Sequence, residues 1–232
     1  MNLHKPQRLS TSRLLVFVAT SASIAMTANL AAAVTIFESG TLGPTGVTWQ
    51  QAIDGEVPAT NIKNSVFTGV RFHLDLPVVT SRIGGHFLSP SNGTFFGAIV
   101  ELDDENDFPD SGDLSTPDVL GNTLLTFPNP SGETNSNLSI SLDTGWYALV
   151  FGSGLFGATT NGGALRNGSD IGDPSYIAYV GSRWKNSSPT NGIEFKDYHL
   201  TLEGTIVPES STLIMTFVAF AFVVHKRISN KR

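Results

Sequence analysis

The chain has 232 residues and no cysteine. This absence excludes a thiol nucleophile, a thiolate metal site and a scaffold stapled by disulfides. A domain without disulfides has to be stabilised by burying apolar surface. With 40% hydrophobic residues, the chain is long enough for one domain with a substantial core. We therefore expect a single domain between any targeting segments at the two ends.

Positive charge is also scarce, with 14 Lys and Arg against 20 Asp and Glu, for a formal net charge of -6. A surface that binds nucleic acid needs a surplus of basic residues to meet the phosphates. Several of the basic residues lie near the ends of the chain instead: Lys5, Arg8, Arg13, Lys226, Arg227, Lys231 and Arg232. The middle is more acidic than the whole, so we expect no nucleic-acid partner.

Common catalytic motifs are missing as well. The sequence has no His-Glu-x-x-His pair, no Gly-x-Ser-x-Gly elbow and no phosphate loop ending in Gly-Lys-Ser/Thr. His73 and His199 fall at outward positions of predicted strands and His86 follows a Gly-Gly pair, so we expect all three to be solvated. We predict no catalytic residues, no bound cofactor and no enzymatic activity.

The amino-terminal segment, residues 1–33, has the three parts of a secretory signal. A basic start, "MNLHKPQRLSTSR", precedes an apolar stretch diluted with Ser and Thr, and "AAA" at 31–33 offers the small residues that signal peptidase requires. We predict that this segment is cleaved during export. The alternative is a permanent amino-terminal anchor.

The carboxy-terminal segment, residues 206–232, reads "IVPESSTLIMTFVAFAFVVHKRISNKR". Its apolar run, 211–224, would span about 21 Å as a helix, which is less than the roughly 30 Å hydrocarbon core of a bilayer. The basic residues after it would hold the end on the cytoplasmic side. We therefore expect transient insertion into the inner membrane through a short hydrophobic helix.

This order of features resembles the PEP-CTERM sorting tail of exported bacterial proteins. In that family a Pro-Glu-Pro triplet, a short hydrophobic helix and a basic end are processed by an exosortase. Pro208 and Glu209 match the triplet, whereas Ser210 stands where proline is usual. The basic end is Lys226, Arg227, Lys231 and Arg232. The resemblance implies an exported protein of the cell surface or extracellular matrix of a Gram-negative-type bacterium, associated with exopolysaccharide and biofilm.

The tail can also be compared with two different sorting signals. A sortase signal needs a Leu-Pro-x-Thr-Gly-like motif, which "IVPESST" lacks, and a GPI signal normally ends in apolar residues. Glycosylation-type sequons at Asn92, Asn137, Asn167 and Asn186 keep a eukaryotic cell-surface protein among the alternatives. A last alternative is that the tail is a core helix of the domain.

The middle segment, 34–205, predicts an all-β domain. In "VFTGVRFHLDL" apolar residues alternate with Arg71, His73 and Asp75, which indicates a half-buried strand with these three on its solvent face. "TFFGAIVEL" and "WYALVFG" are continuous apolar runs that suit strands covered on both faces. Further strand candidates are "GVTWQQA", "VVTSRIGGHF", "NTLLTF", "LSISL", "YIAYVGSRW" and "IEFKDYHLTLEG". We predict one β-sandwich of jelly-roll type.

Parts of the middle also resemble a domain that recurs among PEP-CTERM proteins. The stretches are "IGGHF", "FFGAIVEL", "STPDVLGNTLLTFPNPS" and "GWYALVFGSGLFGATTNGGA". This resemblance agrees with the sorting tail, but it implies no mechanism.

Two segments are candidates for ligand binding. The acidic loop, residues 101–113, could hold Ca²⁺ through Asp103, Asp104 and Asp107, although its spacing is not that of an EF-hand and a solvated loop is the alternative. The long segment 152–175 is flanked by aromatic residues. Phe156, Tyr176 and Trp184 could stack on sugar rings, or could complete the core instead.

Together these features predict an exported, non-enzymatic protein of the cell surface or matrix, associated with exopolysaccharide. Its partners would be signal peptidase and an exosortase. A carbohydrate-binding module is the first alternative. A secreted hydrolase with two paired carboxylates is the second.

Overall fold

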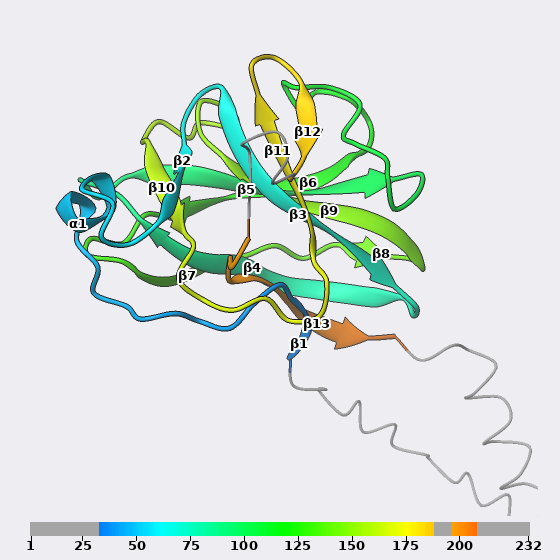
Figure 1. Cartoon of the computed structure of the whole chain (residues 1–232). Helices are drawn as coiled ribbons and strands as arrows, with labels where there is room; N and C mark the ends of the chain where they lie inside the picture. Colours follow the sequence, from blue (N-terminus) through cyan, green and yellow to red (C-terminus); the bar gives the residue numbers. More distant parts are fainter. Residues whose placement is uncertain (1–32, 188–195, 208–232) are drawn as a thin grey trace, which may run out of the picture. The chain divides into compact units, whose positions relative to one another are not determined.

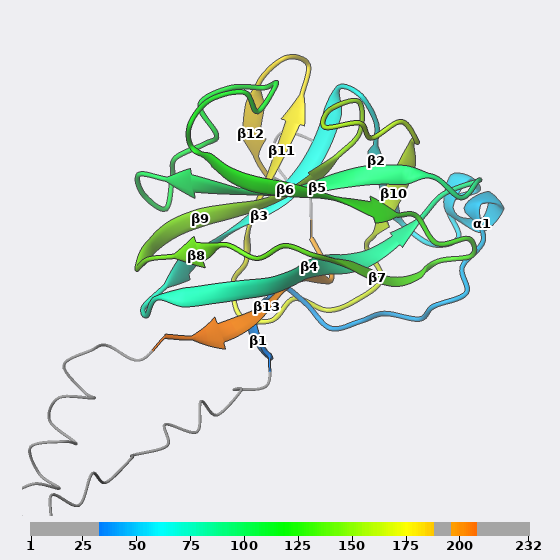
Figure 2. The same ribbon diagram turned by 180° about the vertical axis from the view of Figure 1, so that it is seen from behind.

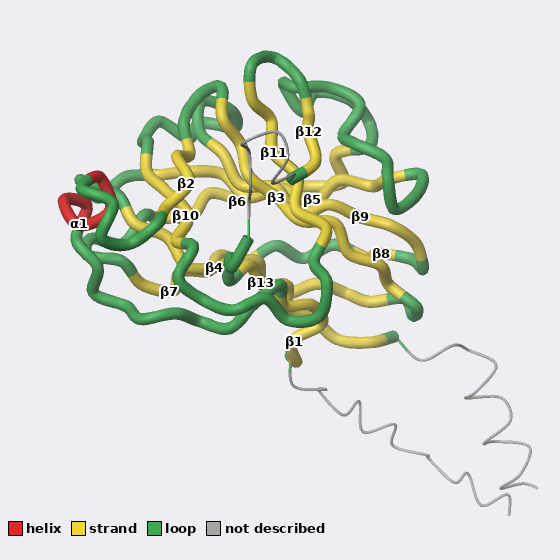
Figure 3. The backbone as a smooth tube through the Cα atoms, in the orientation of Figure 1, coloured by secondary structure: helices red, strands yellow, loops and turns green. Residues whose placement is uncertain are grey.

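A computed structural model describes residues 33–187 and 196–207 (Figure 1). These residues form two antiparallel sheets and one short helix. Figure 3 shows the strands in yellow and the helix in red. The predicted all-β class is confirmed, and the arrangement is consistent with a β-sandwich. The predicted signal, 1–33, and the predicted tail, 206–232, lie outside the described residues except for Ala33, Ile206 and Val207.

The seven-stranded sheet is organised around β4. Its strands are β1 (Val34–Glu38), β2 (Ala59–Ile62), β4 (Val78–Leu88), β7 (Gly132–Asn137), β8 (Ser141–Leu142), β10 (Gly162–Leu165) and β13 (Leu200–Ile206). The main order is β1-β13-β4-β10-β2. β13 and β10 pair with successive stretches of one edge of β4, and β8 and β7 pair along the other edge.

The six-stranded sheet lies over the first one (Figures 1 and 2). Its strands are β3 (Val66–Leu74), β5 (Thr94–Leu102), β6 (Val119–Thr126), β9 (Gly145–Gly152), β11 (Ser175–Val180) and β12 (Trp184–Asn186). The order is β12-β11-β3-β9-β5-β6. β11 pairs with β3 only from Val66 to Arg71, so β3 continues for three residues past the start of β11.

The main hydrophobic core fills the space between the sheets. Phe87 of β4 packs at 4.7 Å from Phe95 of β5 and at 5.0 Å from Phe151 of β9, measured between ring centroids. The inward residues of β3, Val70, Phe72 and Leu74, are buried here as the alternation predicts. Large rings that interlock across two sheets contribute both buried area and specific geometry.

A second apolar cluster, the outer cluster, covers the other face of the six-stranded sheet. Val100 of β5 and Val150 of β9 belong to it and are fully buried. The predicted burial of both faces of these two strands is therefore confirmed. Leu114 and Ala158 from loops cover this face, and β11, a strand of the same sheet, contributes Ile177 to the cluster.

One predicted strand is a helix. The segment "GVTWQQA" contains α1 (Trp49–Ile53), which begins after Thr48. Thr48 and Gln51 form a reciprocal capping box, in which the Thr48 side chain accepts from the Gln51 N–H and the Gln51 side chain accepts from the Thr48 N–H. This local pairing satisfies backbone groups that a strand would need a neighbour to satisfy.

Candidate functional site

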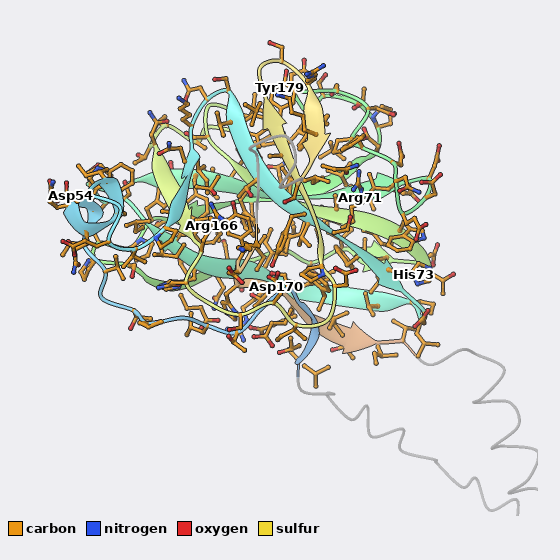
Figure 4. The ribbon with its side chains drawn as sticks, in the orientation of Figure 1. Asp54, Arg71, His73, Arg166, Asp170 and Tyr179 are labelled. Atoms are coloured by element: carbon orange, nitrogen blue, oxygen red, sulfur yellow. The ribbon has the colours of Figure 1, made fainter. Side chains whose placement is uncertain are left out.

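A groove of about 500 Å³ opens beside the end of β3, where β11 no longer pairs with it. We call it the Trp146 groove. It is lined by Phe37, Arg71, Phe72, His73, Glu105, Asn106, Trp146, Ile171, Asp173, Pro174 and Ser175. Arg71 and His73 both come from β3, as Figure 4 shows. The groove therefore joins the end of a central strand, the acidic loop and the segment that leads into β11.

The aromatic wall of the groove is a cross-strand pair. His73 of β3 lies opposite Trp146 of β9, with ring centroids 5.0 Å apart. Trp146 is half-buried and packs against the outer cluster. The His73 side chain is 41% exposed, and its Nδ1 lies 3.1 Å from a carboxylate oxygen of Asp75. The ring of Trp146 is thus fixed in place while part of it faces the groove.

Arg71 holds in place the acidic loop, which forms the acidic wall of the groove. Its Nε donates to the carbonyl of Asp107 at 2.6 Å, and one Nη donates to the carbonyl of Asn106 at 3.1 Å. The other Nη donates to Ser175 Oγ at 3.1 Å and to Asn186 Oδ1 at 2.7 Å. One guanidinium therefore connects the acidic loop to the start of β11 and to β12.

The prediction that Arg71 faces solvent is wrong, because only 3% of its surface is exposed. The acidic loop folds over the outer face of the sheet, and the guanidinium lies 4.4 Å from the ring centroid of Phe108 in that loop. Burial lowers the pKa of Arg71, while Asp107 and Asp104 act in the opposite direction. The chain places a buried cation inside its most acidic segment.

The three calcium candidates lie on the acidic loop, and two of their carboxylates accept from the backbone of that loop. The Asp104 carboxylate accepts from the N–H of Asn106 at 2.7 Å, and the Asp107 carboxylate accepts from the N–H of Asp103 at 2.9 Å. Among the residues that the structure describes, no group of three or more His, Asp or Glu is arranged to hold a metal ion.

The three predicted stacking residues are not brought together. Tyr176 lies in the main core at 4% exposure and donates its hydroxyl to the Asp170 carboxylate at 2.6 Å. Trp184 and Phe156 pack against the outer cluster on the opposite face of the sheet. The indole N–H of Trp184 donates to the carbonyl of Ser111 at 3.2 Å. Trp146, which the sequence places at the start of a strand, is the tryptophan that lines the groove.

Two of the three histidines are buried, so their predicted solvation is wrong. His86 is 1% exposed and His199 is 6% exposed. Loop residues cover them: His199 Nδ1 donates to the carbonyl of Gly40 at 2.7 Å, and His86 Nε2 lies 3.3 Å from Ser131 Oγ. Burial lowers the pKa of His86, and the neighbouring His199 lowers it further.

The contact between Ser131 and His86 was not predicted from the sequence, because the two residues are 45 positions apart. Ser131 is 4% exposed, and its hydroxyl accepts the N–H of Val47 at 3.0 Å. Ser131 does not line the Trp146 groove. This geometry ties the loop before α1 to the sheet.

The second hollow, of about 270 Å³, lies where the described chain begins and where its last strand ends. Its apolar lining is Val34, Ile36, Leu74, Leu76, Val78 and Ile206. Leu76 and Ile206 are 45% and 47% exposed. We call this surface the apolar corner.

The predicted sorting residues, Pro208, Glu209 and Ser210, lie outside the described residues, as does the basic end of the chain. Within the described ranges, no helix is long and apolar enough to cross a bilayer. A scan against protein-family models and a search of curated proteins both give no match to this chain.

Proposed function

We propose that this chain is an exported, non-enzymatic component of the bacterial cell surface or extracellular matrix, with a cleavable targeting segment at each end. Signal peptidase would act after Ala33. An exosortase would act near Pro208 while the tail is transiently inserted in the inner membrane. The proposal rests on the sequence of the two ends and on their relation to the fold.

The main support for the proposal is that the folded part of the chain extends from one proposed cleavage site to the other. β1 begins at Val34, immediately after the proposed signal cleavage, and β13 ends at Ile206, two residues before Pro208. The two strands pair with each other, with Val34 opposite Gly204. Removal of both targeting segments would therefore leave every strand of the two sheets intact.

The apolar corner supports the same arrangement. Val34, Leu76 and Ile206 expose apolar side chains beside the points at which both targeting segments join the domain. Such a surface could contact a membrane or another protein if its apolar area is large enough. A domain tethered through 208–232 would present this surface toward the membrane before cleavage.

We also propose the jelly-roll form of the sandwich. Eight strands remain when β2, β10, β11 and β12 are treated as additions and β8 is grouped with β7, and we number these eight in chain order. One sheet, β1-β13-β4-β7, then has the order 1-8-3-6. The other sheet, β3-β9-β5-β6, has the order 2-7-4-5. Double-sheet jelly rolls of eight strands occur in capsid and lectin domains. Fold alone does not assign an activity, so the groove has to be argued from its residues.

A carbohydrate-binding module is the second candidate function, and the Trp146 groove favours it over a hydrolase. Aromatic rings with nearby carboxylates and amides suit the apolar faces and hydroxyls of sugars. Glu105 and Asp173 line the groove and are exposed to solvent. The general acid of a glycosidase is normally sheltered in apolar surroundings, and neither carboxylate has such shelter.

The sorting proposal is tested in the native host with the double variant Pro208→Ala, Glu209→Ala. We expect this variant to stay in the inner-membrane fraction, whereas the parent protein reaches the cell surface. Glu56→Ala, which changes an exposed carboxylate of the folded part, is the control and should be sorted like the parent. If the double variant reaches the surface as efficiently as the control, the tail is not a sorting signal.

A further inference from the structure

The Trp146 groove combines a fixed aromatic ring with an open strand edge. Its volume of about 500 Å³ falls within the roughly 300–1,000 Å³ of small-molecule sites. In the described chain β11 pairs with β3 only as far as Arg71, so the adjoining edge of β3 from Phe72 to Leu74 has no strand partner there. Backbone groups on such an edge can bond a polar ligand.

The charges around the groove are mostly negative. Glu105 comes from the acidic loop, and Asp173 comes from the segment before β11. Asp75, whose side chain is 94% exposed, lies beside His73. Asp104 and Asp107 are close enough to act on the pKa of Arg71. An anionic ligand would be repelled by this set of carboxylates.

Arg71, the arginine that lines the groove, does not make the groove attractive to an anionic ligand. Its guanidinium already donates four hydrogen bonds inside the protein, to the carbonyls of Asn106 and Asp107 and to the side chains of Ser175 and Asn186. Arg71 is 3% exposed. Arg71 therefore holds the acidic loop in position and does not present its guanidinium group to a carboxylate or phosphate of a ligand.

We propose that the Trp146 groove binds sugar units that carry a protonated amine, with the sugar face on the ring of Trp146 and the amine near Glu105 and Asp173. A cation close to an indole ring gains from the ring quadrupole, and the two carboxylates add Coulombic attraction. This inference rests on the second candidate function and specifies its ligand class. It predicts preference for amine-bearing over N-acetylated sugars and exclusion of uronates.

The test is titration calorimetry of the full-length chain in mild detergent at pH 6, below the ordinary pKa of an amine. The probes are a β-1,4-linked glucosamine tetrasaccharide, its fully N-acetylated counterpart and a galacturonate tetrasaccharide. We expect the glucosamine tetrasaccharide to bind at least about tenfold more tightly than the acetylated one, and less tightly as salt is raised. The galacturonate tetrasaccharide should show no binding.

Matched variants separate this site from the rest of the surface. Trp146→Ala should weaken binding at least about tenfold, whereas Trp49→Ala, on α1 and outside the groove, should leave it unchanged. Asp173→Asn changes an exposed side chain and should reduce the preference for the amine without abolishing binding of the acetylated form. This variant keeps the test valid even if Trp146→Ala fails to fold.

The inference is overturned by equal or tighter binding of the acetylated or uronate probe, by no binding of any probe, or by Trp49→Ala weakening binding as much as Trp146→Ala. Cleavage of the glucosamine tetrasaccharide would support the ligand class but contradict a non-enzymatic function. The sorting experiment depends on cell fractionation and not on sugar binding, so the two proposals fail independently.

Discussion

Arg71 helps to form the Trp146 groove although its side chain is buried. It bonds two carbonyls of the acidic loop and two side chains near β11 and β12. A buried cation without partners would be costly, but here each bond also satisfies an acceptor of the covering segments. The position of the acidic loop over the sheet therefore depends on Arg71.

Replacement of Arg71 by methionine should lower the free energy of unfolding by about 3 kcal/mol, because the four charge-assisted hydrogen bonds of a buried guanidinium are lost. Urea denaturation measures the change. The control is Arg82→Met, which removes a partly exposed ion pair with Glu203 and should cost less than about 1 kcal/mol. Equal losses in the two variants would contradict the role assigned to Arg71.

His86 should make stability depend on pH. Its pKa in the folded protein is lowered by burial and by His199, whereas the ordinary value in an unfolded chain is about 6.5. Below that pH the unfolded chain takes up a proton that the folded protein resists, so stability falls as pH drops. A hydrogen bond with Asn167 and the charge of Glu133 oppose this lowering of the pKa without cancelling it.

The loss from this histidine between pH 7.5 and pH 5.5 should be at most about 1.4 kcal/mol. His86→Gln should remove that part of the pH dependence in urea denaturation. Thr126→Ala, at an exposed position that carries no titratable group, should leave the dependence as it is in the parent. A His86→Gln protein with the full pH dependence of the parent would disprove this assignment.

At the residue scale, the sequence predicted which side chains of β3 enter the main core but not which polar ones are covered. Alternation with period 2 identifies the two faces of a strand. It does not indicate that a loop from another part of the chain will close over one face. Arg71, His86 and His199 were misplaced for this reason, and the groove, which needs three distant segments, was not predicted.

At the scale of elements, β4 depends on a Gly-Gly pair in its middle. A Cβ on Gly84 would lie 2.4 Å from the carbonyl oxygen of Thr134 in β7, and one on Gly85 would lie 2.4 Å from that of His199. The pair lies inside a continuous strand. Close approach of neighbouring backbones is the physical reason for glycine here.

Gly84→Ala should therefore destabilise the protein by about 1–3 kcal/mol, in the range of overpacked interiors. Gly132→Ala is the matched control on the neighbouring strand β7, because its Cβ would meet nothing closer than 3.8 Å. Thermal melting of both variants gives the comparison. The packing argument fails if Gly84→Ala melts at the same temperature as Gly132→Ala.

Elements with a strong apolar pattern were predicted correctly, and weakly patterned ones were not. β3, β5 and β9 follow from alternation or from continuous apolar runs. β7 has the sequence "GETNSN", which lacks residues that favour strands, and it forms because β4 offers an edge. α1 was mistaken for a strand because its capping box is a three-residue signal inside an otherwise strand-like segment.

At the scale of the whole molecule, we propose that the all-β domain lies between two cleavable targeting segments. The first and last strands pair at the edge of one sheet and end next to the proposed processing sites. The fold class could be predicted because nine strand-like stretches with turn residues between them have few other solutions. The pairing of the first strand with the last one could not, since it spans the entire domain.

The most direct measurement is the intact mass of the exported protein from its native host, in strains with and without the exosortase. The account predicts a mass that lacks both 1–33 and the tail beyond the region of Pro208, and a mass that retains the tail when the exosortase is deleted. An exported protein that keeps 208–232 in both strains would contradict it.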